Sequence, residues 1–218
     1  MPATMLRSEM AEPALKPGSA DALLFDLGGV VLDIDFNKAI ATWAGHAGCA
    51  PSELSRRFGI DETFRRHETG LASDAEFFAA LRRTFGVELS DTRFLEGWNA
   101  IFAGEIPDIS ALLARAARRL PLYAFSNTNP PHVAHFSKAF ADVLGHFTKI
   151  FLSSSIGLRK PDAAAYDHVV KAIGVAAERI VFFDDLAENI EGARQRGLIA
   201  VHVTSPDDVA RALAALGI

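Results

Sequence analysis

The chain has 218 residues, of which half are hydrophobic and 22% are charged, and its formal net charge is -5. This balance is ordinary for a globular protein that is long enough for one well-packed core and a smaller second unit. The negative charge and the scattered Lys and Arg residues give no electrostatic reason to expect a nucleic-acid partner.

No apolar run reaches the roughly 20 residues that a helix needs to cross a bilayer, so no membrane partner is expected. Residues 1–20 carry charges and prolines where a signal peptide would have an apolar stretch, and we interpret them as a flexible leader. Cys49 is the single cysteine, so no intrachain disulfide can form. This composition fits a reducing compartment, and we predict a cytoplasmic location.

Five short apolar runs predict the strands of one sheet. The runs are continuous rather than alternating, which is typical of strands that are buried on both faces of a parallel sheet. In chain order they are Ala22–Phe25, Leu122–Phe125, Ile150–Leu152, Ile180–Phe183 and Ile199–Val203.

Segments with helical apolar spacing lie between these runs or follow the last one. They are Ile109–Leu120, Ala163–Ile173, Ile190–Arg196 and Val209–Leu216. Alternating strands and helices predict a doubly wound, Rossmann-like α/β fold. Ligands bind beyond the carboxyl ends of the strands in such sheets. Polar residues follow the predicted strands at this edge, so the fold and the polar residues indicate the same place.

The segment 36–105 interrupts this alternation and is predicted to be an all-helical cap inserted after the first strand. The expected helices are Asn37–Ala47, Pro51–Phe58, Ser73–Thr84 and Ser90–Phe102, and no strand is expected there. Ser73 and Glu76 have the spacing of a capping box. The remaining residues, 21–35 and 106–218, form the predicted core domain. A helical lobe packed far from the site is the alternative that the pattern leaves open.

Two polar clusters follow the first two predicted strands. Asp26 ends the first strand, and Gly28 and Gly29 follow it in a turn where a ligand can approach the backbone. Ser126 and Asn127 follow the second strand and offer a hydroxyl, an amide and turn N–H groups, which can hold phosphate oxygens. Each cluster alone is more often structural, as a turn or a helix cap.

Two further clusters carry charge. Lys160 precedes Pro161, a residue favoured in the first turn of a helix, and its ammonium can act as a point charge on phosphate. Asp184 and Asp185 are adjacent after the fourth run, where they would repel each other unless a cation lay nearby. Mg²⁺ is held by one or two carboxylates with water and substrate phosphate, so this pair predicts a magnesium site.

In this order, the clusters resemble the four motifs of the haloacid dehalogenase superfamily of hydrolases, over residues 21–218. The four motif positions are Asp26, Ser126, Lys160 and Asp184-Asp185. The pattern most resembles the subgroup that contains the phosphatase acting on α-D-glucose 1-phosphate. The resemblance implies a phosphatase that acts on a small phosphorylated metabolite, as a monomer or homodimer, with Mg²⁺ as its cofactor.

The resemblance also implies a mechanism in which Asp26 attacks phosphorus and forms an aspartyl-phosphate that water then cleaves. The implied magnesium ligands are Asp26, the backbone carbonyl of Gly28, Asp184 and Asp185. For Asp184, support of the metal's waters or of the lysine is expected. The groups implied to hold the transferring oxygens are Ser126, the Asn127 backbone and Lys160.

Gly28 departs from the pattern of most phosphatases in the superfamily, which carry a second aspartate at this position. A glycine cannot transfer a proton, a function typically worth about 10²–10⁴ in rate. The glucose 1-phosphate phosphatase subgroup also has a glycine here, and a substrate whose leaving group needs little help would suit it. The hypothesised alternative proton donors are His67, Glu68, Asp33 and Asp35, and the alternative role for Asp33 and Asp35 is to hinge the cap.

Two other functions compete with the phosphatase prediction. A 2-haloacid dehalogenase shares the aspartate nucleophile but needs no metal, which leaves the adjacent Asp184 and Asp185 without a purpose. A non-catalytic binding or regulatory protein would keep the fold without the chemistry, and Gly28 is the main support for that alternative.

Overall fold

The computed structural model describes residues 15–218. Residues 1–14, most of the predicted leader, lie outside the described residues. Leu15 packs against the main hydrophobic core and Ala20 is buried in it, so packing begins before the predicted start of the core at Asp21. Within the described range, no helix combines the length and apolarity needed to cross a membrane.

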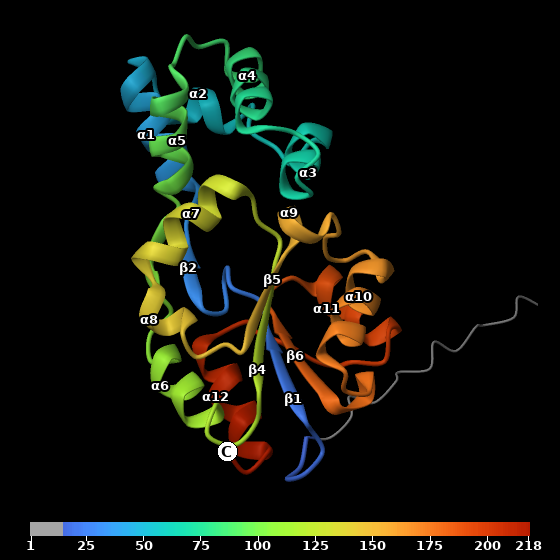
Figure 1. Cartoon of the computed structure of the whole chain (residues 1–218). Coiled ribbons are helices and arrows are strands. Elements are labelled where there is room, and N and C mark those ends of the chain that lie inside the picture. The colour runs from blue at the N-terminus through green and yellow to red at the C-terminus, as the bar shows by residue number, and fades with distance from the viewer. Residues whose placement is uncertain (1–14) are drawn as a thin grey trace, which may run out of the picture.

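Five parallel strands form the central sheet in the order β5-β4-β1-β6-β7 (Figure 1). The strands are β1 (Ala22–Phe25), β4 (Leu122–Ser126), β5 (Lys149–Leu152), β6 (Ile180–Asp184) and β7 (Ile199–His202). The central strand β1 pairs with β4 on one side and with β6 on the other. All five predicted strands are present, and the doubly wound α/β fold is confirmed.

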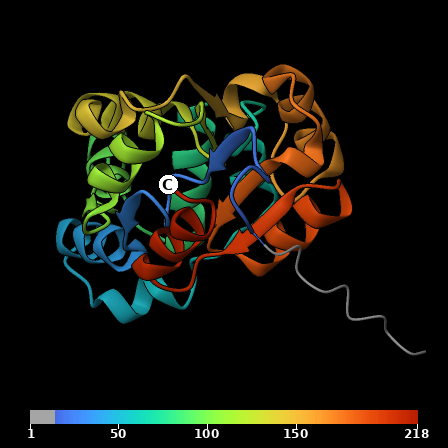
Figure 2. The same cartoon turned by 90° about the horizontal axis from the view of Figure 1, so that it is seen from below.

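Helices cover both faces of this sheet (Figure 2). One face packs against α6 (Ile109–Ala116), α7 (Pro130–Ala139), α8 (Ala141–Leu144) and α12 (Pro206–Ala215). The other packs against α10 (Ala163–Ile173) and α11 (Ala187–Gln195). Alternate residues of β1 enter the two cores: Leu23 and Phe25 enter one, and Ala22 and Leu24 enter the other. This two-sided burial explains why the predicted strands are continuously apolar.

A helical part lies beyond the carboxyl ends of the strands (Figure 1). It consists of α1 (Phe36–Ala47), α2 (Pro51–Ser55), α3 (Glu62–Glu68), α4 (Asp74–Phe85) and α5 (Asp91–Asn99). Its own core is rich in aromatic rings, with Trp43 and Trp98 stacked at 6.0 Å. The predicted capping box is present, because Ser73 N donates to Glu76 Oε2 at 2.8 Å and Glu76 N donates to Ser73 Oγ at 3.3 Å.

The prediction that segment 36–105 contains no strand is wrong. Strands β2 (Leu32–Ile34) and β3 (Phe102–Glu105) pair in antiparallel fashion where the chain enters and leaves the helical part. Such short strands show too few alternations to be detected, and Phe102 continued the helical spacing of α5, which ends at Asn99. Helix α3 was also missed, because charged residues dominate it. The division at residues 36 and 105 stays a prediction.

Two short helices complete the described fold. They are α9 (Ser153–Ile156), directly after β5, and the 3₁₀ helix η1 (Ala177–Arg179), directly before β6.

Candidate active site

Lys160 joins two carboxylates at the carboxyl end of the sheet. Asp26 follows β1 and Asp184 ends β6, so the pairing of these strands brings the two side chains together. Lys160 Nζ lies 2.9 Å from Asp26 Oδ2 and 2.6 Å from Asp184 Oδ2. The Lys160 and Asp184 side chains are completely buried, and Asp26 is almost so. This arrangement is a buried, charge-assisted hydrogen-bond chain.

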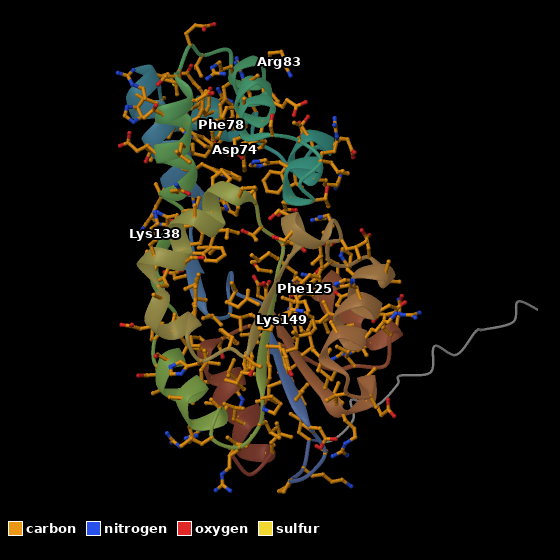
Figure 3. The ribbon with its side chains drawn as sticks, in the orientation of Figure 1. Asp74, Phe78, Arg83, Phe125, Lys138 and Lys149 are labelled. Atoms are coloured by element: carbon orange, nitrogen blue, oxygen red, sulfur yellow. The ribbon has the colours of Figure 1, made fainter. Side chains whose placement is uncertain are left out.

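The surroundings of Lys160 keep it charged. Its ammonium lies 5.4 Å from the centroid of the Phe125 ring and 5.5 Å from that of Phe182. Figure 3 labels Phe125 at the centre of the molecule, between the helices on the two sides of the sheet. Burial alone would lower the pKa of the Lys160 ammonium, but Asp184 and Asp26 outweigh it and raise that pKa.

Asn127 fixes the loop that carries Lys160. Its Nδ2 donates to the Lys160 carbonyl at 2.9 Å, and its Oδ1 accepts from the Lys160 backbone N–H at 2.9 Å. Helix α10 begins at Ala163 with Asp162 as its N-cap, so Pro161 precedes the helix rather than occupying its first turn. The Asn127 side chain, rather than the helix start, therefore positions Lys160.

Asp184 has little capacity left for another ligand. Its Oδ1 accepts from Leu186 N at 2.9 Å and from Asn189 Nδ2 at 2.9 Å, while its Oδ2 accepts from Lys160. The carbonyl of Asn189 accepts in turn from Tyr166 Oη at 2.7 Å. Of the two supporting roles expected for Asp184, these contacts favour holding the lysine.

The carboxylate cluster fits a divalent cation. Asp26, Asp184 and Asp185 each offer an oxygen within 4.8 Å of the others, so three carboxylates face the single ammonium of Lys160. Burial raises the pKa of Asp26 to about 8. Lys160 lowers this pKa, whereas repulsion from Asp184 and Asp185 adds to the increase. Burial and repulsion by Asp184 also raise the pKa of Asp185. A bound cation opposes both shifts.

Two further observations support this fit. Gly29 has a φ of +74°, and a Cβ added there would lie 2.5 Å from Asp185 Oδ2, so only a glycine leaves room for this carboxylate. Asn189 Oδ1 is buried and has no hydrogen-bond donor among residues 15–218. Mg²⁺ usually keeps several waters, and one of them can supply this donor. The oxygen-only donor set suits Mg²⁺.

A cavity of about 390 Å³ opens onto this cluster. The predicted site residues that line it are Asp26, Gly28, Ser126, Asn127 and Asp185. Lys160 and Asp184 are buried in contact with one another, and Lys160 also contacts Asp26. Ser126 is almost buried, and its hydroxyl forms no hydrogen bond with the described part of the chain. The structure thus brings all the predicted site residues to one place, with a free hydroxyl at the cavity.

Glu68 and Arg159 are cavity residues that the sequence did not single out as a pair. Arg159 Nε donates to Glu68 Oε2 at 3.1 Å, and both residues line the cavity. The Glu68 carbonyl accepts from Ser153 Oγ at 2.6 Å, which ties α3 to α9. Burial raises the pKa of the Glu68 carboxyl, although Arg159 opposes the shift. The two residues are 91 positions apart, so sequence spacing offered no signal.

Of the four hypothesised proton donors, Glu68 alone lines the cavity. His67 is buried elsewhere, where its Nε2 lies 2.8 Å from Asp74 Oδ1 and its ring stacks on Phe77. Asp35 caps α1, and Asp33 is exposed on β2.

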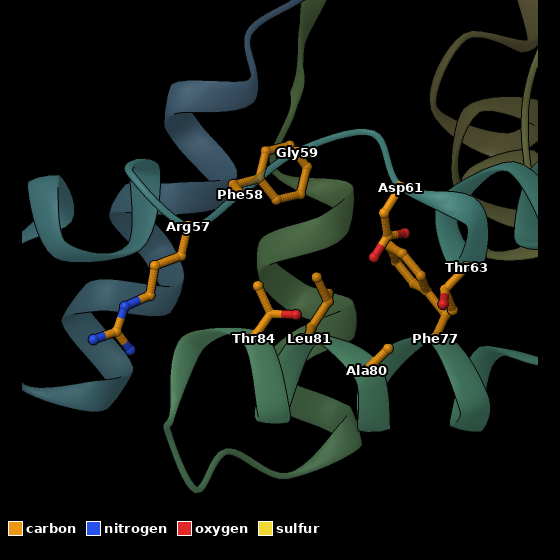
Figure 4. A pocket seen from close by; sticks show the side chains of 9 residues that line it. All are labelled: Arg57, Phe58, Gly59, Asp61, Thr63, Phe77, Ala80, Leu81 and Thr84. Carbon is orange, nitrogen blue, oxygen red and sulfur yellow. The ribbon is translucent and has the colours of Figure 1, made fainter.

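A second cavity of about 100 Å³ lies inside the helical part (Figure 4). Its single acidic residue, Asp61, accepts from Phe64 N at 2.8 Å as the N-cap of α3. The guanidinium of Arg57, which also lines it, donates to the Phe85 carbonyl. These charged groups have structural partners, and the cavity shares none of the predicted site residues.

Residues 20–197 match the family described as haloacid dehalogenase-like hydrolases, and the chain belongs to this family. It is 32% identical over 213 residues to Phosphatase MT3486 of Mycobacterium tuberculosis, covering 91% of this chain and 96% of that protein. It is 41% identical over 190 residues to the sesquiterpene phosphatase astK of Aspergillus oryzae, covering 84% of this chain and 89% of that protein.

A family enzyme from Bacteroides thetaiotaomicron, crystallised with magnesium and inorganic phosphate, has a similar structure. The TM-score is 0.74 at 25% identity, with 84% of this chain and 93% of that chain covered. The predicted superfamily is confirmed, and the chain is a phosphatase of this family.

Proposed function

We propose that this chain hydrolyses small phosphomonoesters with Mg²⁺, through a covalent phosphate on Asp26. The observation that carries the proposal is the buried chain from Asp26 through Lys160 to Asp184, with Asp185 beside it at the floor of the cavity. A cytoplasmic location and a monomeric or homodimeric state stay predictions.

The metal would be held by Asp26, Asp185 and the Gly28 carbonyl. When bound, Mg²⁺ neutralises charge on the phosphate at the reacting centre. Lys160 opposes the effect of burial on Asp26 and so favours its ionised form, which is the form that can attack. The free Ser126 hydroxyl and the N–H groups of the following turn would hold phosphoryl oxygens.

The reaction takes two steps. An Asp26 oxygen forms a bond to phosphorus, and the bond from phosphorus to the ester oxygen breaks with its electron pair on that oxygen. Glu68 would give this oxygen a proton, and the alcohol leaves. Water then attacks phosphorus and gives a proton to Glu68, and Asp26 is released as a carboxylate. A raised pKa of Glu68 and its place in the cavity support this role.

Two substrate classes belong in the first test. The resemblance to the glucose 1-phosphate phosphatase subgroup favours a small sugar phosphate. The Aspergillus oryzae relative, named a sesquiterpene phosphatase, suggests a phosphate ester of a terpene alcohol.

The test compares wild type with Asp26→Asn on an aryl phosphate, glucose 1-phosphate and a terpenyl phosphate, each with Mg²⁺ or with EDTA. Asp33→Asn is the matched control, because Asp33 is exposed and does not line the cavity. We expect Mg²⁺-dependent phosphate release that falls about 10⁴-fold or more in Asp26→Asn and is kept in the control. Halide release from 2-chloropropionate without metal would instead favour the dehalogenase alternative. Absence of turnover on every ester would favour the alternative of a non-catalytic binding or regulatory protein.

A further inference from the structure

Away from the carboxylates, the wall of the 390 Å³ cavity is largely apolar. Phe36 at the start of α1, Ile60 before α3 and Trp98 of α5 come from the helical part. Leu186, which precedes α11, comes from the sheet-containing part. Segments far apart in the chain therefore converge on one apolar surface that adjoins the predicted phosphate site.

Several of these side chains are exposed although they are large and apolar. Phe36 is 40% exposed, Ile60 is 58% exposed and Leu186 is 48% exposed. Two other large hydrophobic residues in residues 15–218, Leu71 and Leu95, are comparably exposed but lie outside this cavity. Most of the strongly exposed large apolar side chains of the described chain thus gather at one cavity, which is typical of a binding site for an apolar group.

Several polar groups next to Trp98 on this wall already have partners, whereas the carboxylate of Glu188, an exposed lining residue beside Leu186, forms no hydrogen bond within residues 15–218. Asn129 Oδ1 accepts from Trp98 Nε1 and from His132 N, each at 3.1 Å. The His132 ring contacts the Trp98 carbonyl and the Asn129 amide. Glu68 is paired with Arg159. The hydroxyls of a sugar lying against Trp98, Asn129 and His132 would find few free partners there, and burying them without partners is unfavourable.

We infer that this cavity takes the phosphate monoester of an aliphatic alcohol, with the hydrocarbon lying against Phe36, Ile60 and Leu186. The inference rests on the proposed function and specifies its substrate class.

The first arm of the test is a series of unbranched alkyl monophosphates from two to ten carbons, with Mg²⁺. Their leaving groups are chemically alike, so a change in kcat/KM reports contact with the wall. We expect kcat/KM to rise by up to about fourfold for each added CH₂, the factor that corresponds to about 0.8 kcal/mol, and then to level off. The longer esters are expected to exceed glucose 1-phosphate.

The second arm uses Ile60→Ser, with Leu71→Ser as its control. Both positions are exposed in the helical part, but Ile60 alone of the two lines the cavity. We expect Ile60→Ser to lower kcat/KM for octyl phosphate about 4–15-fold, equivalent to one or two buried CH₂ groups, and to leave ethyl phosphate unchanged. Leu71→Ser is expected to match wild type on both.

A third arm separates this inference from the proposed function. Calorimetry with the matching alkyl phosphonates and Mg²⁺ measures affinity without turnover. Turnover or affinity that is independent of chain length would overturn the apolar class, even if every ester is hydrolysed. A chain-length dependence of binding with no hydrolysis would keep the apolar site and overturn the proposed catalysis.

Discussion

The floor and the wall of the cavity are built in opposite ways. At the floor, Asp26, Lys160 and Asp184 are buried, and the lysine holds both carboxylates at short distances. Along the wall, Phe36 and Ile60 are exposed and belong to the helical part. The charged groups of the floor are held in position before any ligand binds, as electrostatic catalysis requires. The wall offers apolar surface whose benefit comes only with an apolar ligand.

A few hydrogen bonds hold the two regions together. Trp98 of α5 donates to Asn129, which is the N-cap of α7. Ser153 of α9 donates to the Glu68 carbonyl at the end of α3. Such contacts position the wall over the floor. Substitutions in either region therefore test whether the floor provides the charged groups and the wall the apolar contacts.

Lys160→Met is expected to have the largest effect on the floor. It leaves Asp26 and Asp184 buried without their cation, and breaking a buried pair in this way typically costs about 3–5 kcal/mol. Urea unfolding at pH 7 measures the loss. Mg²⁺ should restore part of the stability, because it replaces the missing charge. A variant as stable as wild type would show that the ion pair is not the support of the floor.

Glu68→Gln tests the one wall residue to which chemistry is assigned. We expect a loss of about 10²-fold for an alkyl phosphate, whose leaving group needs a proton, and little loss for a nitrophenyl phosphate. His67→Gln is the matched control, because His67 does not line the cavity. Equal losses on both esters would contradict proton donation and leave Glu68 with a positioning role through Arg159.

Gly29→Ala perturbs the floor without removing any of its charges. The added Cβ would displace the Asp185 carboxylate, and we expect about 10–100-fold weaker magnesium affinity. The Mg²⁺ concentration that gives half-maximal activity measures this change. Gly157→Ala is the control for the backbone strain, because Gly157 has a similar positive φ and open space around it. The same loss in both variants would remove the link to Asp185.

His132 tests the junction between the two regions with a smaller effect. Burial lowers the pKa of His132 to about 3, so the residue is neutral in the folded protein. Below pH 6.5 the unfolded chain binds a proton that the folded protein does not, so the free energy of unfolding falls as the pH falls from 6.5 toward 3. Unfolding free energies from pH 7 to 4 should fall more steeply in wild type than in His132→Gln, by up to about 1.4 kcal/mol per pH unit. Parallel curves would contradict a buried neutral His132.

The floor was the more predictable region. Continuous apolar runs ending in Asp26 and Asp184 indicated strands of a parallel sheet, and parallel strands bring their carboxyl ends to one edge. The motif predicted that Lys160 lies at the site. The hydrogen bonds by which the Asn127 side chain holds Lys160 were not predicted, because a contact between positions 33 residues apart has no periodic signal in the sequence.

The wall was less predictable. In the sequence, Phe36 and Ile60 look like core residues, since an exposed apolar side chain and a buried one give the same pattern. The antiparallel pair β2–β3 was missed because each strand is too short to show alternation. Helix α3, which carries Glu68, was missed because most of its residues are charged.

The central claim is that phosphate passes through Asp26. Its most direct test is to quench the Mg²⁺ enzyme during turnover, reduce it with borohydride and map the peptides by mass spectrometry. Borohydride converts an acyl phosphate to an alcohol and leaves a free carboxylate unchanged, so we predict reduction at Asp26 alone, dependent on both substrate and Mg²⁺. Sustained turnover with Asp26 unreduced, or reduction at another carboxylate, would contradict the account.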